Sequence, residues 1–133
     1  MGWAEPNPLS PERVYKVLTP EQWDHAKTVG DLAVDIDRQD GFVHLSTARQ
    51  LAGTLQRYFA KSEEVILLQI PCAALGTGLV WEAPSEGGDR VGVFPHFYGP
   101  MPPSWVEKRW KLKRGAFDLP RELLNQAEPA SPQ

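Results

Sequence analysis

Apolar positions along this 133-residue chain follow two spacings, one typical of a helix face and one typical of strands. Over residues 47–59, apolar side chains recur three and four positions apart. Thr47 and Gln50 form a Thr-x-x-Gln capping box at the start of this stretch. The pattern predicts an amphipathic helix. The residues of its buried face are Leu51, Leu55 and Phe59.

The residues immediately before this helix predict a strand. Residues 42–45 suit a half-buried pleated surface, and they run directly into Ser46 and Thr47. If Thr47 is the N-cap, the hydroxyl of Ser46 is left free beside His44. The unpaired N–H groups and the dipole of a helix start favour an anion. The sequence therefore predicts a binding corner where the strand meets the helix.

Other apolar segments predict the remaining strands. Residues 65–70 are an almost unbroken apolar run, typical of a strand buried on both faces in the middle of a sheet. Residues 14–18 and 106–113 predict two more strands. Residues 79–81 and 91–94 are separated by a turn-rich segment and predict a hairpin.

A second capping box lies near the start of the chain. Thr19 and Gln22 flank a proline at the first helical position, and a thin apolar stripe ends before Gly30. These signals predict a short helix. Residues 31–40, by contrast, are acidic and carry apolar residues at alternate positions, as in an edge strand or an extended loop.

Proline and aromatic residues concentrate in residues 95–100, which predict an irregular loop of the kind that often lines a site. Residues 120–126 predict a short helix. We expect one globular domain over residues 14–127, with a flexible arm at 1–13 and a disordered tail at 128–133. Short strands with two or three helices, and without regular βαβ alternation, indicate an α+β fold.

Composition restricts the classes of partner and compartment. A hydrophobic content of 41% fits a soluble globular domain, and a net charge of −3 gives no overall attraction to nucleic acids or acidic membranes. The single cysteine, Cys72, allows no internal disulfide and is expected to be buried and inert in a reducing compartment. No apolar run is long enough for a membrane span and no signal peptide is recognisable, so we expect a cytoplasmic protein.

Two candidate catalytic residues stand at predicted strand ends. His44, beside two hydroxyls, suits acid–base chemistry or contact with a phosphate, although it could instead be a core histidine satisfied by the backbone. Glu82 follows Trp81 at the end of a strand, where it could accept ribose hydroxyls or act as a base. Its alternative is simple contact with solvent.

His96 and Tyr98 flank Phe97 and point the same way if the segment is extended. Such rings suit a wall for a flat base or nicotinamide, or else they cover the core. The three histidines lack zinc-site spacing, so no metal is predicted. Residues 108–114 hold the main basic cluster, which could follow an RNA backbone or form a solvated strand face.

Three motifs in this order resemble the domain-of-unknown-function 952 family: GFVHLST at 41–47, WE at 81–82 and FPHFYGP at 94–100. A strand containing Tyr15 precedes them. That family is grouped with the ADP-ribosyltransferase-like fold, a split and strongly curved mixed sheet around a nicotinamide-dinucleotide cleft. Residues 43–46 also look like a segment of the RNA 2′-phosphotransferases. The resemblance implies a cleft with an ancestral NAD site, without a known reaction.

The candidate site follows from these motifs and residue types, and its members should converge on one cleft from neighbouring strand ends. We predict His44 and Glu82 as catalytic residues. The predicted ligand-binding residues are Ser46, Thr47, Trp81, His96, Tyr98 and Gly99.

The chain also departs from the patterns of that fold. His44, Ser46 and Glu82 could replace its usual triads, but Lys16 and its neighbour occupy the place of an early-strand arginine. Two function classes therefore stay open. One is an enzyme of ADP-ribosyl or phosphoryl transfer that uses NAD, and the other is a binding module without turnover. RNA binding through residues 108–114 is a third.

Overall fold

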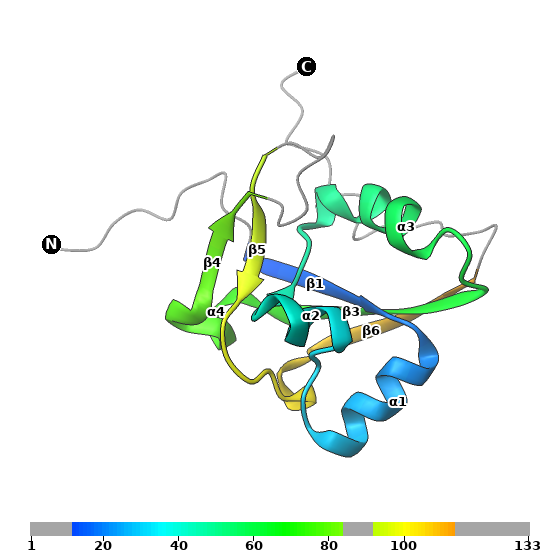
Figure 1. Cartoon of the computed structure of the whole chain (residues 1–133), viewed down its shortest axis with the longest axis horizontal. Helices are drawn as coiled ribbons and strands as arrows, with labels where there is room; N and C mark the ends of the chain where they lie inside the picture. Colours follow the sequence, from blue (N-terminus) through cyan, green and yellow to red (C-terminus); the bar gives the residue numbers. More distant parts are fainter. Residues whose placement is uncertain (1–11, 84–91, 114–133) are drawn as a thin grey trace, which may run out of the picture.

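The structure, a computed structural model, describes residues 12–83 and 92–113, which form two three-stranded sheets (Figure 1). The helix predicted at 120–126 and the predicted tail lie outside the described residues, as does most of the predicted arm. The first sheet has the order β1 (Arg13–Leu18), β3 (Glu64–Pro71), β6 (Lys108–Lys113). The second has the order β2 (Val43–His44), β5 (Phe94–Phe97), β4 (Leu79–Glu82).

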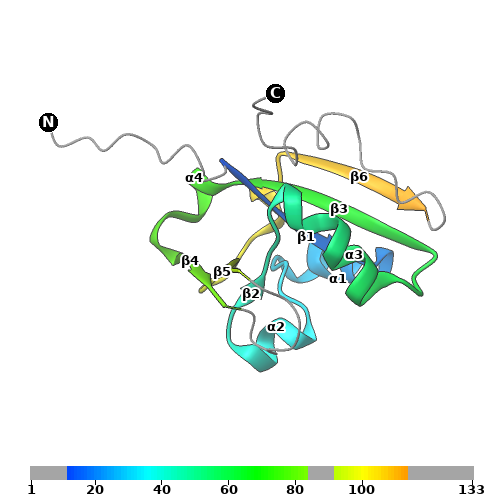
Figure 2. The ribbon, with the colours of Figure 1, turned by 90° about the horizontal axis from the view of Figure 1, so that it is seen from above.

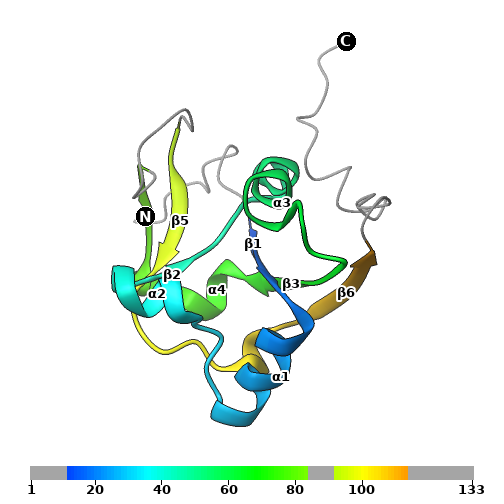
Figure 3. The same cartoon turned by 45° about the vertical axis from the view of Figure 1, so that its right-hand side comes forward.

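Strand β3 is the centre of the first sheet and is buried on both faces, which confirms its predicted position. Ile66 and Leu68 point to the core on the side of α1 (Pro20–Val29), whereas Val65 and Leu67 point to the side of α3 (Leu51–Phe59). Figures 1 and 3 show these two helices on opposite faces of the sheet. The unbroken apolar run is therefore explained by helices covering both faces.

Both capping boxes form as predicted. At the start of α1, the Thr19 hydroxyl accepts a hydrogen bond from the Gln22 backbone N–H (3.1 Å), and the Gln22 side-chain oxygen accepts one from the Thr19 backbone N–H (2.9 Å). The Thr47–Gln50 box opens a 3-10 turn, Ala48–Gln50, that continues directly into α3. Leu51 and Leu55 of α3 are buried against the first sheet, and Phe59 packs beside them.

The acidic stretch 31–40 is not the expected edge strand or extended loop, because it contains the helix α2 (Asp35–Asp40). The carboxylate of Asp37 accepts a hydrogen bond from the Val34 backbone N–H (2.9 Å) and so caps the first turn from within. Gly41 ends the helix with φ 89°. A helix of six residues is too short to show the apolar period of a helix, so its sequence cannot be told from the alternating pattern of a strand.

The predicted proline-rich loop at 95–100 begins inside a strand, because Phe94–Phe97 form β5 between β2 and β4. Proline cannot donate a ladder hydrogen bond and is tolerated where pairing ends. Pro95 lies opposite Leu45, one residue past the end of β2, and its carbonyl accepts a hydrogen bond from the Leu45 backbone N–H (3.0 Å). The first strand of the hairpin predicted from 79–94 is present as β4, and it pairs antiparallel as expected, but its partner β5 is Phe94–Phe97 and not the predicted 91–94.

The segment after β2 joins the two sheets. Leu45 bonds to β5, and the next residue, Ser46, exchanges two backbone hydrogen bonds with Tyr15 of β1 (2.8 and 2.9 Å). In Figure 2 the second sheet lies to the left and the first to the right. The expected α+β fold is therefore present as two sheets, but every pairing between described strands is antiparallel, so the sheet is not mixed. The described residues also contain four α-helices where two or three were expected.

Short elements complete the described chain: α4 (Cys72–Leu75) and the 3-10 turns Gly76–Gly78 and Pro103–Trp105. Cys72 is half-buried, and burial raises the pKa of its thiol. Among the described residues, no helix has the length and apolar character needed to cross a membrane.

Candidate functional site

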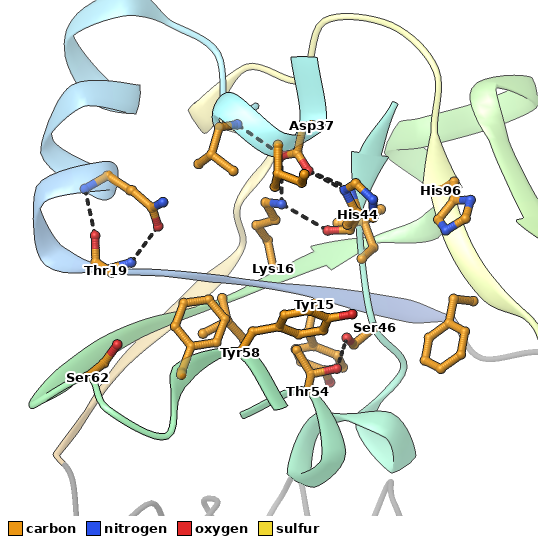
Figure 4. Close-up of a pocket in the computed structure, with 17 residues that line it drawn as sticks. Tyr15, Lys16, Thr19, Asp37, His44, Ser46, Thr54, Tyr58, Ser62 and His96 are labelled. Carbon is orange, nitrogen blue, oxygen red and sulfur yellow. Dashed lines mark hydrogen bonds and ion pairs between the residues drawn. The ribbon is translucent and has the colours of Figure 1, made fainter. Parts of the chain in front are cut away.

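A cavity of about 460 Å³ lies along β1, between α2, α3 and the second sheet (Figure 4). Three of the predicted site residues, His44, Ser46 and His96, line it. Above β1 in Figure 4, Lys16 and His44 extend toward Asp37. Below β1 lie five hydroxyl-bearing side chains of the wall: Tyr15, Ser46, Thr54, Tyr58 and Ser62. Thr19 adds a sixth hydroxyl at the start of α1.

A buried ion pair forms one wall of this cavity. Lys16 Nζ lies 2.7 Å from Asp37 Oδ2, and the two side chains are 5% and 1% exposed. Lys16 also donates to the backbone carbonyl of His44 (3.0 Å). Buried charges are tolerated only when they are paired and hydrogen-bonded, and here both conditions hold. The pair therefore links β1 to α2 and β2.

The pKa of Asp37 reflects these contacts. Burial alone would raise it, but the charge and hydrogen bond of Lys16, together with hydrogen bonds from His44 and Val34, outweigh that effect and lower the pKa from 3.8 to about 2. Asp37 is therefore a carboxylate at all ordinary pH values. Its oxygens are engaged by α2, β1 and β2 at once.

His44 lies between two carboxylates at the edge of the cavity. Its Nδ1 is 2.6 Å from Asp37 Oδ1, and its Nε2 is 2.9 Å from Asp40 Oδ2. The ring is 30% exposed, so the predicted core histidine is not what the structure contains. Because both nitrogens are engaged, His44 has no spare ring nitrogen for a ligand in this arrangement. The catalytic role predicted for His44 stays a prediction.

His96 faces His44 across the β2–β5 pair, with ring centroids 5.6 Å apart. Its Nδ1 lies 2.7 Å from Glu82 Oε1, and the same oxygen accepts a hydrogen bond from the Tyr98 hydroxyl (2.8 Å). The hydrogen bonds from His96 and Tyr98 lower the pKa of Glu82, and the hydrogen bond to the Glu82 carboxylate raises the pKa of Tyr98. Glu82 and Tyr98 thus reach the site through His96, and neither lines the cavity.

The predicted binding corner differs from expectation at Ser46. Its hydroxyl is not free, because Ser46 Oγ lies 2.8 Å from Thr54 Oγ1 on the next helix. Thr47 is the helix cap, as predicted, and lies outside the cavity lining. The sequence does not specify how the next helix packs against the strand end, so it did not show that a hydroxyl of that helix would bond to Ser46. The phosphate-binding argument therefore loses its free hydroxyl.

Two predicted ligand-binding residues lie away from the cavity. Trp81 is 37% exposed on β4, and Gly99 has φ 136° in the turn after β5. Neither contributes to the lining. Their binding roles remain predictions.

The basic cluster predicted for RNA lies on β6, an edge strand of the first sheet. Its members within the described residues, Lys108, Arg109, Lys111 and Lys113, are all exposed. Arg114 lies outside the described residues. Alternate residues of the strand, Trp110 and Leu112, pack on the side of α3.

Sequence reasoning missed three polar residues that line the cavity, Lys16, Asp37 and Thr54, and also Asp40, which contacts His44. Lys16 stood out as a charge inside the apolar strand at 14–18, and a charge in such a place is rarely buried without a partner. That signal indicated an acidic partner. Nothing in the sequence identified which of the many carboxylates it would be.

Comparison with known proteins gives related structures without an assigned activity. A crystal structure of protein CC0527 from Caulobacter crescentus is similar to this chain, with a TM-score of 0.71 and 32% identity over 87% of this chain and 99% of the other. The solution structure of CC0527 gives a TM-score of 0.65 and 34% identity, over 77% and 86% of the two chains. A family model described as "Protein of unknown function (DUF952)" matches residues 17–109. No curated protein matches the chain.

Proposed function

The chain belongs to the DUF952 family of unknown function, and we propose that its cavity binds the nucleoside half of an NAD-type or ADP-ribose-type ligand. The main support is the meeting of His44, Ser46 and His96 on one cavity of about 460 Å³. That volume lies within the range of small-molecule sites in proteins.

The chemistry of the wall suits a sugar and a flat ring. Ser46, Thr54 and Tyr58 carry hydroxyls, which match the hydroxyls of a ribose. The faces of Tyr15 and Phe94 add aromatic surface, which suits a base or a nicotinamide ring. A ligand with both parts would use both kinds of surface.

The charges of the wall favour the nucleoside half over the diphosphate. Lys16 is the sole lysine or arginine among the described residues that line the cavity, and it is already paired with Asp37. A diphosphate buried there would meet no spare cation. NAD therefore fits this wall through its ribose and ring, with its phosphates outside.

The proposal has two forms. In one, the protein is an enzyme of ADP-ribosyl or phosphoryl transfer, and in the other it binds the ligand without a reaction. The engaged nitrogens of His44 favour the binding module without turnover, because that residue offers no proton acceptor. An enzyme would need a group other than His44 to accept a proton from the substrate. RNA binding through the exposed cations of β6 is the third class, and the same experiment includes it.

Isothermal titration calorimetry tests the proposal with adenosine, ADP-ribose, NAD and a short single-stranded RNA. We expect the three nucleoside ligands to bind. Thr54→Val should weaken them about threefold to tenfold, the effect of one lost hydrogen bond. The matched control is Thr28→Val, whose hydroxyl bonds within α1 away from the cavity. Incubation with NAD and assay of released nicotinamide then separates enzyme from binder.

Two results would contradict the proposal. One is the absence of binding by all three nucleoside ligands at millimolar concentration. The other is equal weakening by Thr54→Val and Thr28→Val, which would place the ligand elsewhere. If the protein binds RNA but none of the nucleoside ligands, and Lys111→Ala abolishes that binding, the function would be RNA binding through β6.

A further inference from the structure

We propose that His96, and not Glu82, is the proton acceptor of this cavity, with Glu82 and Tyr98 as the residues that position it. The ligand part of this inference rests on the proposed function. The protonation state of the ring does not, because it follows from contacts within the chain.

The contacts of Glu82 determine its role. Its Oε1 is bonded by both His96 Nδ1 (2.7 Å) and the Tyr98 hydroxyl (2.8 Å), and the residue does not line the cavity. A carboxylate accepts hydrogen bonds, so Nδ1 of His96 must donate its proton here. Glu82 consequently acts on a ligand only through the ring of His96.

The other ring nitrogen of His96 is open. Nε2 has no hydrogen-bond partner among the described residues, and none of their fully buried polar side-chain atoms lacks a partner. Nε2 must therefore lie at the small exposed part of the ring, which is 3% exposed overall and lines the cavity. With the proton on Nδ1, the lone pair on Nε2 is available to a ligand in the cavity that His96 lines.

The ring is also held in place. Phe42 stacks on His96 with centroids 4.0 Å apart, and the backbone is paired with β2 on one side and β4 on the other. A ring fixed by stacking, by two strands and by Glu82 presents Nε2 in one direction. Fixed orientation by a second group is what allows a histidine to act as a base.

The chemistry is a single proton transfer. A hydroxyl of the bound nucleoside donates a hydrogen bond to Nε2, and in a reaction its proton passes to Nε2 while the electron pair stays on the oxygen. The imidazolium so formed carries its charge next to the Glu82 carboxylate, which stabilises it. His44 cannot take this part, because both its nitrogens are bonded to carboxylates.

Long-range ¹H–¹⁵N NMR of the histidine rings in the full chain tests the protonation state without a ligand. We expect neutral His96 to be protonated on Nδ1. In Glu82→Gln the amide can also donate to Nδ1, so a form protonated on Nε2 should be detected. The exposed Glu63→Gln should change nothing, and Tyr98→Phe should keep the proton on Nδ1. Protonation of wild-type His96 on Nε2 would overturn the inference.

Titration of the same sample with adenosine, and with 2′,3′-dideoxyadenosine, tests the ligand contact. Adenosine should move the Nε2 resonance through its 2′- or 3′-hydroxyl, whereas the analogue, which lacks these two hydroxyls and keeps only the 5′-hydroxyl, should bind without moving it. If adenosine moves Thr54 and Tyr58 but not Nε2, the assignment to His96 is wrong. If neither compound moves any cavity residue and the proton is on Nδ1, the proposed function fails, while the state of His96 stands.

Discussion

The two sheets of this protein use buried positions differently. In the first sheet, the buried residues of β3 are aliphatic from Val65 to Leu68 and are covered by α1 and α3. In the second sheet, the buried or half-buried pair His44 and His96 is bound by carboxylates. The comparison indicates that apolar burial on both faces stabilises β3, whereas contacts with carboxylates hold the two histidines of the β2–β5 pair.

The largest effect is expected at Asp37, because its contacts connect the two sheets. Asp37→Asn removes the partner of the buried Lys16 and weakens the contacts to His44 and Val34. Breaking a buried ion pair on one side is strongly destabilising, so we expect a loss of about 3–5 kcal/mol in the free energy of unfolding. Urea denaturation followed by tryptophan fluorescence measures it. The exposed Asp35→Asn is the control, and equal losses would show that the pair does not hold the sheets together.

The apolar side of the comparison is tested on α3. Leu55 is 3% exposed and packs against β3, so Leu55→Ala should lower the free energy of unfolding by about 2–5 kcal/mol through lost burial and the cavity left behind. Gln56→Ala, on the exposed face of the same helix, should change it by less than about 0.5 kcal/mol. A small loss in Leu55→Ala under urea would mean that α3 contributes little to the core.

Acid should weaken the polar region selectively. The pKa of Asp37 is lowered from 3.8 to about 2 in the folded protein, so its contribution is fully present above about pH 4 and is lost as the pH falls through 2. The shift corresponds to about 2 kcal/mol of folding free energy. Urea melts at pH 5, 4, 3 and 2 measure this slope. In Asp37→Asn the slope over the same range should be shallower, and an unchanged slope would assign the acid sensitivity to other carboxylates.

The two capping boxes allow a matched test of the two regions. Thr19 caps α1 below the first sheet, and Thr47 caps the turn that leads from the junction into α3. Each Thr→Ala change should destabilise by about 1 kcal/mol. Thermal melts of the two variants measure this. A much larger loss for Thr47→Ala would show that the junction at Ser46 depends on the cap.

The smallest effect is expected at Tyr98. Tyr98→Phe removes one of the two hydrogen bonds that lower the pKa of Glu82, so that pKa should rise toward its ordinary value. Stability should hardly change, because Glu82 and Tyr98 are largely exposed. Carboxyl ¹³C NMR across a pH titration measures the shift. Tyr58→Phe should leave Glu82 unaffected, and an unchanged pKa in Tyr98→Phe would refute the contact.

Local chemistry determined most of the fold. Both capping boxes, the buried centre strand and the amphipathic helix depend on residues within a few positions of one another, so the sequence alone predicted them. The sequence did not predict the six-residue α2 or the strand at Phe94–Phe97, because their local patterns are not typical of a helix or of a strand. The helix α2 is too short to show a helical period. In β5, Pro95 lies opposite Leu45, one residue past the end of β2, and takes part in pairing there only as an acceptor.

For the candidate site, the sequence by itself predicted that His44 and Glu82 end strands, which they do, whereas it placed His96 in a loop and the residue lies inside β5. Only the tertiary structure decided which of them face the cavity and which are engaged elsewhere. The partners lie far along the chain, since Lys16 meets Asp37 across 21 positions and Glu82 meets His96 across 14. A buried charge requires a partner, but the fold alone determines which carboxylate comes within 3 Å of it.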